Sequence, residues 1–222
     1  MPRSSEQTHA RIVNAAHVMF WRNGFVRASL DDIADEACVT KRTLYQHFRS
    51  KDDLMAEVLL RASELSMQRL RRYFDQDYDT PAAFVDAMFG ELARWAASPR
   101  WMGAGFTRVA IELADLPGHP ARTIARRHKQ MLEIRFAAVL EKAHIPSASE
   151  RACEIALLWE GAMTLTLIHA DRRYIQVAAS AAKRLLQSLE MQSTQFSPGH
   201  QPGAEPGGAG GSGVRCTKVS VR

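Results

Sequence analysis

Apolar residues recur every three to four positions through most of the chain, a period that predicts amphipathic helices and not strands. The first helix is expected from about Glu6 to Asn23, and Gly24 follows it as a residue typical of helix C-termini. The same periodicity predicts further helices at about 30–37, 41–48, 51–74, 81–98, 102–114, 120–144, 148–170 and 172–191. The sequence therefore predicts an all-α fold of about nine helices.

Helix start signals support these boundaries. Capping boxes, in which a hydroxyl and an acidic side chain three residues later satisfy each other's backbone N–H groups, are expected at several helix starts. Their pairs are Ser29–Asp32, Ser50–Asp53 and Ser147–Glu150. Thr40 and Thr80 are expected to cap two further helices, the second with Pro81 in its first turn.

The short predicted helices at about 30–37 and 41–48 are joined by a tight turn, which is the arrangement of a helix-turn-helix unit at about residues 29–48. Exposed positions of the second helix carry donors that reach base edges and phosphates in a major groove. These positions are Lys41, Arg42, Thr43, Gln46 and His47. The net charge of +5 permits a nucleic-acid partner without requiring one. A solvated charged face is the alternative interpretation of Lys41 and Arg42.

The segment from Ile12 to Leu54 resembles the DNA-binding domain of the TetR family of bacterial regulators. The resemblance is carried by Gly24-Phe25, Ser29-Leu30, Ile33-Ala34, Val39-Thr40-Lys41, Thr43-Leu44-Tyr45, His47-Phe48 and Ser50-Lys51. The helical remainder of the chain fits the architecture of the family but shows no comparable motif.

The resemblance implies a role for each matched position. Phosphate contacts are implied for Ser29, Thr40, Tyr45, His47 and Lys51. Base contacts are implied for Lys41, Arg42, Thr43 and Gln46. Phe20, Ile33, Leu44 and Phe48 would hold the three helices together. A merely structural role is the alternative for Tyr45 and His47.

Cys38 departs from the family pattern, because the family usually has Gly at this turn. If the turn requires a positive φ, a Cys there carries a strain of about 1–3 kcal/mol. A redox role is an alternative, because the neighbouring Lys41 and Arg42 would favour the thiolate.

The resemblance also implies the organisation of the whole chain. Residues 1–54 would form the DNA-binding domain and residues 55–192 a helical effector-binding and dimerisation domain. Residues 193–222 are rich in Gly and Pro and are expected to form a disordered tail. The implied function is a ligand-responsive repressor that binds a palindromic operator in double-stranded DNA as a homodimer, in the bacterial cytoplasm and associated with the nucleoid.

The last two helices are expected to form the dimer interface as a four-helix bundle. The helix at about 148–170 is apolar on nearly all sides, so an intrachain core would cover one side and a partner subunit the other. The last helix carries an apolar stripe suited to such pairing, formed by Ile175, Ala178, Ala182, Leu185 and Leu189.

The middle helices could enclose a pocket for a small apolar or amphipathic effector. Its apolar walls would come from Trp95, Trp101, Met102, Phe106, Phe136 and Trp159. Polar groups on the same helices are Arg108, Glu112, His128 and Arg135. Ordinary core packing and solvent exposure are the alternative interpretation of these residues.

Other function classes have little support. Cys38, Cys153 and Cys216 are far apart and form no CxxC pair, which indicates neither a zinc site nor disulfides and favours a reducing compartment. The polar residues 1–7 do not form a signal peptide, and no segment is expected to cross a membrane. Catalytic signatures and cofactor motifs are absent.

Two alternatives to a ligand-responsive regulator remain from the sequence. A helical-bundle enzyme would place E-x-x-H pairs in its core, and Glu6/His9 and Glu141/His144 have this spacing but lie near predicted helix ends. A helical adaptor of the same fold without a small-molecule ligand is the second alternative.

Overall fold

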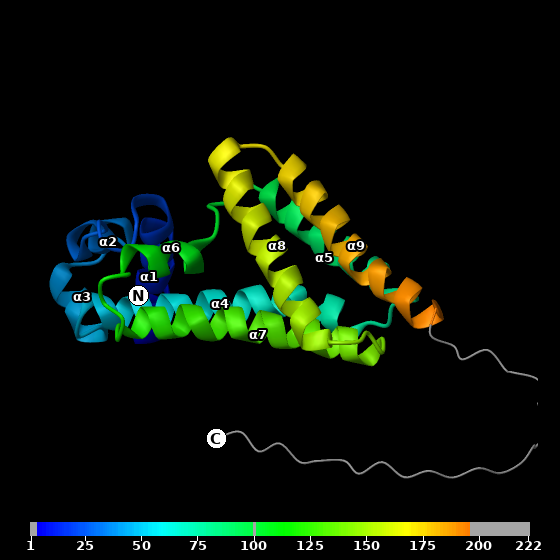
Figure 1. Cartoon of the computed structure of the whole chain (residues 1–222). Helices are drawn as coiled ribbons and strands as arrows, with labels where there is room; N and C mark the ends of the chain where they lie inside the picture. Colours follow the sequence, from blue (N-terminus) through cyan, green and yellow to red (C-terminus); the bar gives the residue numbers. More distant parts are fainter. Residues whose placement is uncertain (1–3, 100, 196–222) are drawn as a thin grey trace, which may run out of the picture.

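The computed structural model describes residues 4–99 and 101–195, and within them the chain forms nine α-helices and no strand (Figure 1). Their bounds are α1 Ser5–Asn23, α2 Leu30–Glu36, α3 Lys41–His47, α4 Lys51–Asp75, α5 Pro81–Ala96, α6 Gly105–Glu112, α7 Pro120–Lys142, α8 Ala148–His169 and α9 Arg173–Gln195. The predicted all-α fold is confirmed. Helix α9 runs past its predicted end near residue 191, and residues 196–222 of the predicted tail lie outside the described residues.

A first hydrophobic core holds α1, α2 and α3 against the first half of α4. Phe20, Ile33 and Leu44 are fully buried in it, and Phe48 is nearly so. The same core continues beyond α4, because residues of α6 and the start of α7 belong to it; they are Phe106, Val109, Ala121 and Ala125. The DNA-binding helices therefore rest on α6 and α7.

A second core fills the space between the second half of α4 and helices α5, α7, α8 and α9. Aromatic rings dominate its centre: the ring of Trp159 meets those of Phe89 and Phe136 edge-on, at centroid distances of 5.5 and 6.1 Å. Helices α4 and α7 lie side by side and extend along both cores (Figure 1). These two helices are the rigid connection between the two halves of the molecule.

Four predicted helix caps form hydrogen bonds. Each hydroxyl accepts from the backbone N–H three residues later, at 3.0 Å for Ser29, 3.1 Å for Thr40, 3.0 Å for Ser50 and 3.2 Å for Thr80. The predicted cap at Ser147 is wrong, because this residue has φ 52° and ψ 41° and makes no capping bond. A capping hydroxyl reaches the first turn from extended backbone, and Ser147 is left-handed instead.

The apolar stripe of α9 also differs from the prediction. Ile175, Ala178 and Ala182 are buried within the chain together with Leu186, against α5 and α8. Leu185 is only half-buried, and the side chain of Leu189 lies outside the described residues. Most of the stripe assigned to dimer pairing is thus covered within the same subunit.

Candidate nucleic-acid interface

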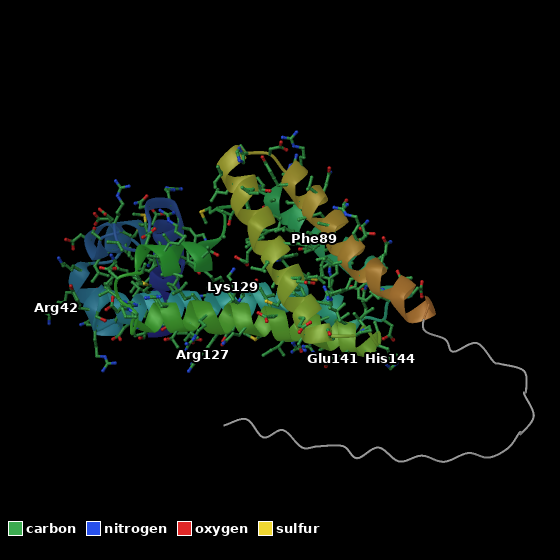
Figure 2. All side chains as sticks on the ribbon, in the orientation of Figure 1. Arg42, Phe89, Arg127, Lys129, Glu141 and His144 are labelled. Atoms are coloured by element: carbon green, nitrogen blue, oxygen red, sulfur yellow. The ribbon has the colours of Figure 1, made fainter. Side chains whose placement is uncertain are left out.

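Helix α3 lies at the outer end of the N-terminal domain. Leu44 and Phe48 bury one face of it in the first core, so the opposite face is turned to solvent. Figure 2 shows Arg42 extending from this end of the molecule. The predicted contact residues are exposed at Ser29, Thr40, Lys41, Arg42, Tyr45 and Gln46, and half-buried at Thr43, His47 and Lys51. The fold therefore brings all nine predicted positions to the region of α2, α3 and the start of α4.

Several of these polar side chains already have partners within the chain. The Lys41 ammonium lies 2.7 Å from an oxygen of Asp31, and this hydrogen bond raises the pKa of Lys41. The hydroxyls of Thr40 and Thr43 lie 2.8 Å apart. Arg42 and Gln46, in contrast, have no hydrogen bond or ion pair with another described residue, so both are available to a ligand on this surface.

Cys38, which stands where the family usually has Gly, has left-handed backbone geometry in the turn between α2 and α3. Cys38 has φ 48°, and its N–H donates to the carbonyl of Asp35 at 2.9 Å. A non-glycine residue in this region costs about 1–2 kcal/mol. The guanidinium of Arg11 in α1 donates to the carbonyl of Ala37 and, at 3.0 Å, to that of Cys38. Arg11 therefore braces the turn, a role that appears only when α1 is placed against it.

The turn between α1 and α2 is held by helices α4 and α6. Lys51 donates to the carbonyl of Val26 at 2.7 Å, and Glu112 accepts from the Val26 N–H at 2.9 Å. Arg108 donates to Glu112 at 2.6 Å and to the carbonyl of Trp21 at 2.7 Å. This set of contacts, which we call the Val26 clamp, is formed by Val26, Lys51, Arg108 and Glu112. It ties α1 and the turn after it to α4 and α6.

Helix packing at the clamp leaves no space for extra atoms. A Cβ on Gly105, the first residue of α6, would overlap the indole of Trp21 in α1. Gly24 has φ 100°, and a Cβ there would come within 2.8 Å of the Arg108 guanidinium. A further contact joins the starts of α7 and α4, where His119 Nε2 lies 3.3 Å from Asp52.

Two cavities collect most of the residues predicted to line a pocket. The larger, of about 550 Å³, lies between α6, α7 and α8 and includes Phe106, Phe136 and Trp159. The smaller, of about 280 Å³, includes Trp95, Met102, Phe106, His128 and Trp159. Trp101 lies outside both and packs edge-on against Trp95 at 4.6 Å, and Arg108 belongs to the Val26 clamp.

An ion pair separates the two cavities. Lys129 lines both of them and forms an ion pair with Glu160, whose other oxygen accepts from the Thr107 hydroxyl at 2.8 Å. Burial lowers the pKa of Lys129, against the opposing effect of Glu160. Lys129, Glu160 and Arg69 could not be predicted as cavity residues, because nothing along the chain indicates that they face an interior space.

Residues typical of metal or catalytic sites do not converge. Among the described residues, no group of three or more His, Cys, Asp or Glu side chains could hold a metal ion. Glu141 and His144 are exposed near the end of α7, far from α1 with Glu6 and His9 (Figure 2). None of the described helices has the length and apolar character needed to cross a membrane.

Known sequences match the N-terminal part of the chain. The family described as "Bacterial regulatory proteins, tetR family" matches residues 12–58. The HTH-type transcriptional regulator UidR of Escherichia coli K12 is 37% identical over 99 residues, which are 42% of this chain and 50% of UidR. The HTH-type transcriptional repressor SCO4008 of Streptomyces coelicolor is 42% identical over 130 residues, 55% of this chain and 64% of that protein. The chain thus spans about half the length of UidR.

Solved structures extend the likeness to the remaining helices. SCO4454, a TetR-family transcriptional regulator from Streptomyces coelicolor, has a TM-score of 0.76 at 22% identity and covers 83% of this chain and 96% of its own. The reduced form of NemR from Escherichia coli has a TM-score of 0.73 at 18% identity and covers 80% and 96%. Residues 12–58 thus match the tetR family of bacterial regulatory proteins, and the described residues share their fold with solved TetR-family regulators.

Proposed function

We propose that this protein is a sequence-specific DNA-binding transcriptional repressor of the bacterial cytoplasm. The observation that carries the proposal is the exposed face of α3, where Arg42, Tyr45 and Gln46 extend to solvent while Leu44 and Phe48 hold the helix on its core. A helix presented in this way enters a major groove, and an Arg there donates two hydrogen bonds to a guanine. The name of SCO4008, a transcriptional repressor, supports repression over activation.

The operator would be palindromic, because the regulator would bind it as a dimer. Apolar side chains lie exposed on α8 and α9 after the intrachain stripe is covered; they are Leu157, Leu165, Leu167, Ile168 and Val177, each at least 38% exposed. An exposed patch of this kind on neighbouring helices is typical of a protein interface. A second subunit on this face would complete a four-helix bundle and bring two α3 helices to half-sites about 34–36 Å apart.

Ligand responsiveness would operate through the cavities. An effector shifts the regulator away from DNA only if it binds more tightly to a dimer shape in which the two α3 helices are wrongly spaced. Helix α4 begins at Lys51 beside the DNA-binding surface, and its residues Ala62, Ser66 and Arg69 line the smaller cavity. The same rigid helix would therefore transmit a displacement from the cavity to α3.

Selection of sites from a random duplex DNA library at near-physiological salt tests the proposal. Enrichment of an inverted repeat by the wild-type protein is the expected result, and the spacing of its halves reports the dimer geometry. Binding without enrichment would leave a non-specific, charge-driven contact and would contradict the proposal. Specific binding that no small molecule alters would favour a regulator or adaptor of this fold without an effector.

A further inference from the structure

The smaller cavity lies between the two halves of the molecule. His17 and Trp21 of α1 form one wall, and α4, α5, α6, α7 and α8 form the others. Large rings dominate these walls, among them Trp95, Phe106 and Trp159. Its volume of about 280 Å³ is close to the lower end of the range of small-molecule sites, which suits an occupant of one or two rings.

The charged groups on the cavity wall are all cationic. Arg69 and Lys129 line it, and none of its lining residues is an acid. The two histidines add no further positive charge, since burial lowers the pKa of His17 and that of His128, the latter to about 3. Lys129 is neutralised by Glu160 from the side of the larger cavity. The least compensated positive charge therefore lies at Arg69, whose ion pair with Glu91 is long, at 3.8 Å.

Arg69 lacks a full partner for its guanidinium. Its Nε is buried and makes no hydrogen bond within the described part of the chain, and the nearest Glu91 oxygen is 3.8 Å away. The other contacts of that carboxylate fall on its second oxygen, Oε2, which accepts from the Tyr73 hydroxyl at 2.7 Å and from Arg94 at 3.0 Å, with Arg72 at 3.5 Å, whereas Arg69 faces Oε1. One carboxylate thus serves three guanidinium groups, and a buried donor without an acceptor is costly.

The position of Arg69 fixes how an occupant would be oriented. Its guanidinium lies over the ring of Trp95, 4.2 Å from the ring centroid, so the cation is held against an aromatic wall. An acceptor that meets the Arg69 guanidinium from within the cavity would have its body among the rings of Trp21, Phe106 and Trp159. A single missing acceptor beside apolar walls matches one carboxylate on a flat ring system and not a dianionic phosphate.

We propose that the smaller cavity binds an aromatic monocarboxylate of one or two rings, with its carboxylate on the guanidinium of Arg69. The inference rests on the proposed function only in that this ligand would be the effector. It deepens that function by naming the chemical class of the ligand and the residue that selects it.

Isothermal titration calorimetry on the full-length protein, without DNA, tests the ligand class. The probes are 1-naphthoate, the neutral 1-naphthamide and the cationic 1-naphthylmethylammonium, with benzoate and benzamide as a smaller pair. We expect at least one carboxylate to bind about tenfold or more tightly than its own amide, as is usual for a charge-assisted hydrogen bond, and the cation to bind least. The proposal would be overturned if each amide bound as tightly as its own carboxylate, or if the cation bound as tightly as 1-naphthoate.

Arg69→Met tests the assigned residue, and Arg71→Met is its matched control. Arg71 lies on the same helix, is exposed and pairs with Asp75, so its loss removes the same charge away from the cavity. The preference for carboxylate over amide should vanish in Arg69→Met and persist in Arg71→Met. An unchanged preference in Arg69→Met would overturn the assignment. If that variant does not fold, Arg69→Lys keeps the charge without the Nε–H and should reduce the preference.

A separate titration of operator DNA distinguishes this inference from the proposed function. Carboxylate-selective binding that leaves DNA affinity unchanged would support the cavity assignment and contradict the ligand-responsive part of the proposed function. Sequence-specific DNA binding without any carboxylate preference would support the proposed DNA-binding function and contradict the cavity assignment.

Discussion

Lys51 and Glu112 both form hydrogen bonds with the backbone of Val26: the Lys51 ammonium donates to the Val26 carbonyl, and the Glu112 carboxylate accepts from the Val26 N–H. Burial lowers the pKa of Lys51, while the Glu112 charge opposes this shift. A residue that the family resemblance assigns to a DNA phosphate is thus engaged within the protein. If Lys51 turns to DNA, it must release Val26, which would link operator binding to the Val26 clamp.

Glu112→Ala should destabilise the protein, because it leaves the Val26 N–H and Arg108 without their acceptor. We expect a loss of about 1–3 kcal/mol in the free energy of unfolding, measured by urea denaturation. Glu64→Ala is the control, since Glu64 is exposed on α4, and it should change stability by less than about 0.5 kcal/mol. Equal effects of the two substitutions would show that the clamp adds no stability.

Arg42→Ala should change sequence preference. The exposed Arg42 is expected to read a base, so its loss should relax discrimination at one base pair of each half-site by about 1–3 kcal/mol. Tyr45→Ala should instead weaken binding to all sequences about equally, as loss of a phosphate contact does. Quantitative binding to a set of single-base operator variants separates the two. An unchanged preference in Arg42→Ala would remove Arg42 from the base contacts.

His128 should make the fold sensitive to acid. The ring is 3% exposed, its Nδ1 lies 2.9 Å from the Ser63 hydroxyl, and burial lowers its pKa to about 3. In the unfolded chain the ring regains a pKa near 6.5, so between these values the unfolded state binds more protons and stability falls as the pH falls. From pH 7 to pH 5 this single group should cost about 2 kcal/mol.

His128→Gln keeps a hydrogen-bonding group near Ser63 and removes the titration. Its stability should therefore fall less between pH 7 and pH 5 than that of the wild type, in urea unfolding at both pH values. His144→Gln, at an exposed position, should retain the wild-type slope. If the stability of wild type and of His128→Gln fell equally between pH 7 and pH 5, the His128 ring would take up its proton as readily in the folded state as in the unfolded chain.

Ile168→Asp should weaken the proposed dimer. Ile168 is 66% exposed on α8, and a carboxylate there would be desolvated by a second subunit. We expect the dimer dissociation constant to rise about 100-fold or more in analytical ultracentrifugation. Ile134→Asp is matched, because Ile134 is 67% exposed but lies on α7. A dimer weakened by Ile134→Asp and not by Ile168→Asp would place the interface elsewhere.

The local signals in the sequence were sufficient for the helices and for most of their starts. Thr40 and Ser50 cap the helices that they precede because capping depends on atoms three residues apart. Ser147 has the same local pattern, but the chain reverses there through left-handed residues, His144 among them, and the cap does not form. The left-handed geometry at Ser147 belongs to the connection between α7 and α8, and the local capping pattern does not predict it.

The candidate sites likewise contain residues that a local pattern identifies and residues that only the folded structure brings together. The exposed face of α3 follows from the periodicity of one helix, so Arg42 and Gln46 could be predicted. Arg11, Arg69 and Lys129 could not, because their contacts join helices far apart in the chain. The stripe of α9 was assigned to a partner for a related reason: periodicity identifies a buried face but not which subunit buries it.

Trp21 belongs to the DNA-binding helices and is at the same time a wall of the smaller cavity, held against Gly105 without space for another atom. The smaller cavity is consequently not contained in residues 55–192. Excising the first 54 residues would open it to water, so an isolated C-terminal fragment is a poor substitute for the whole protein in any search for ligands. Exchanging the DNA-binding domain for that of another regulator would likewise change one wall of the smaller cavity. Such chimaeras should therefore show altered ligand selectivity along with a new operator.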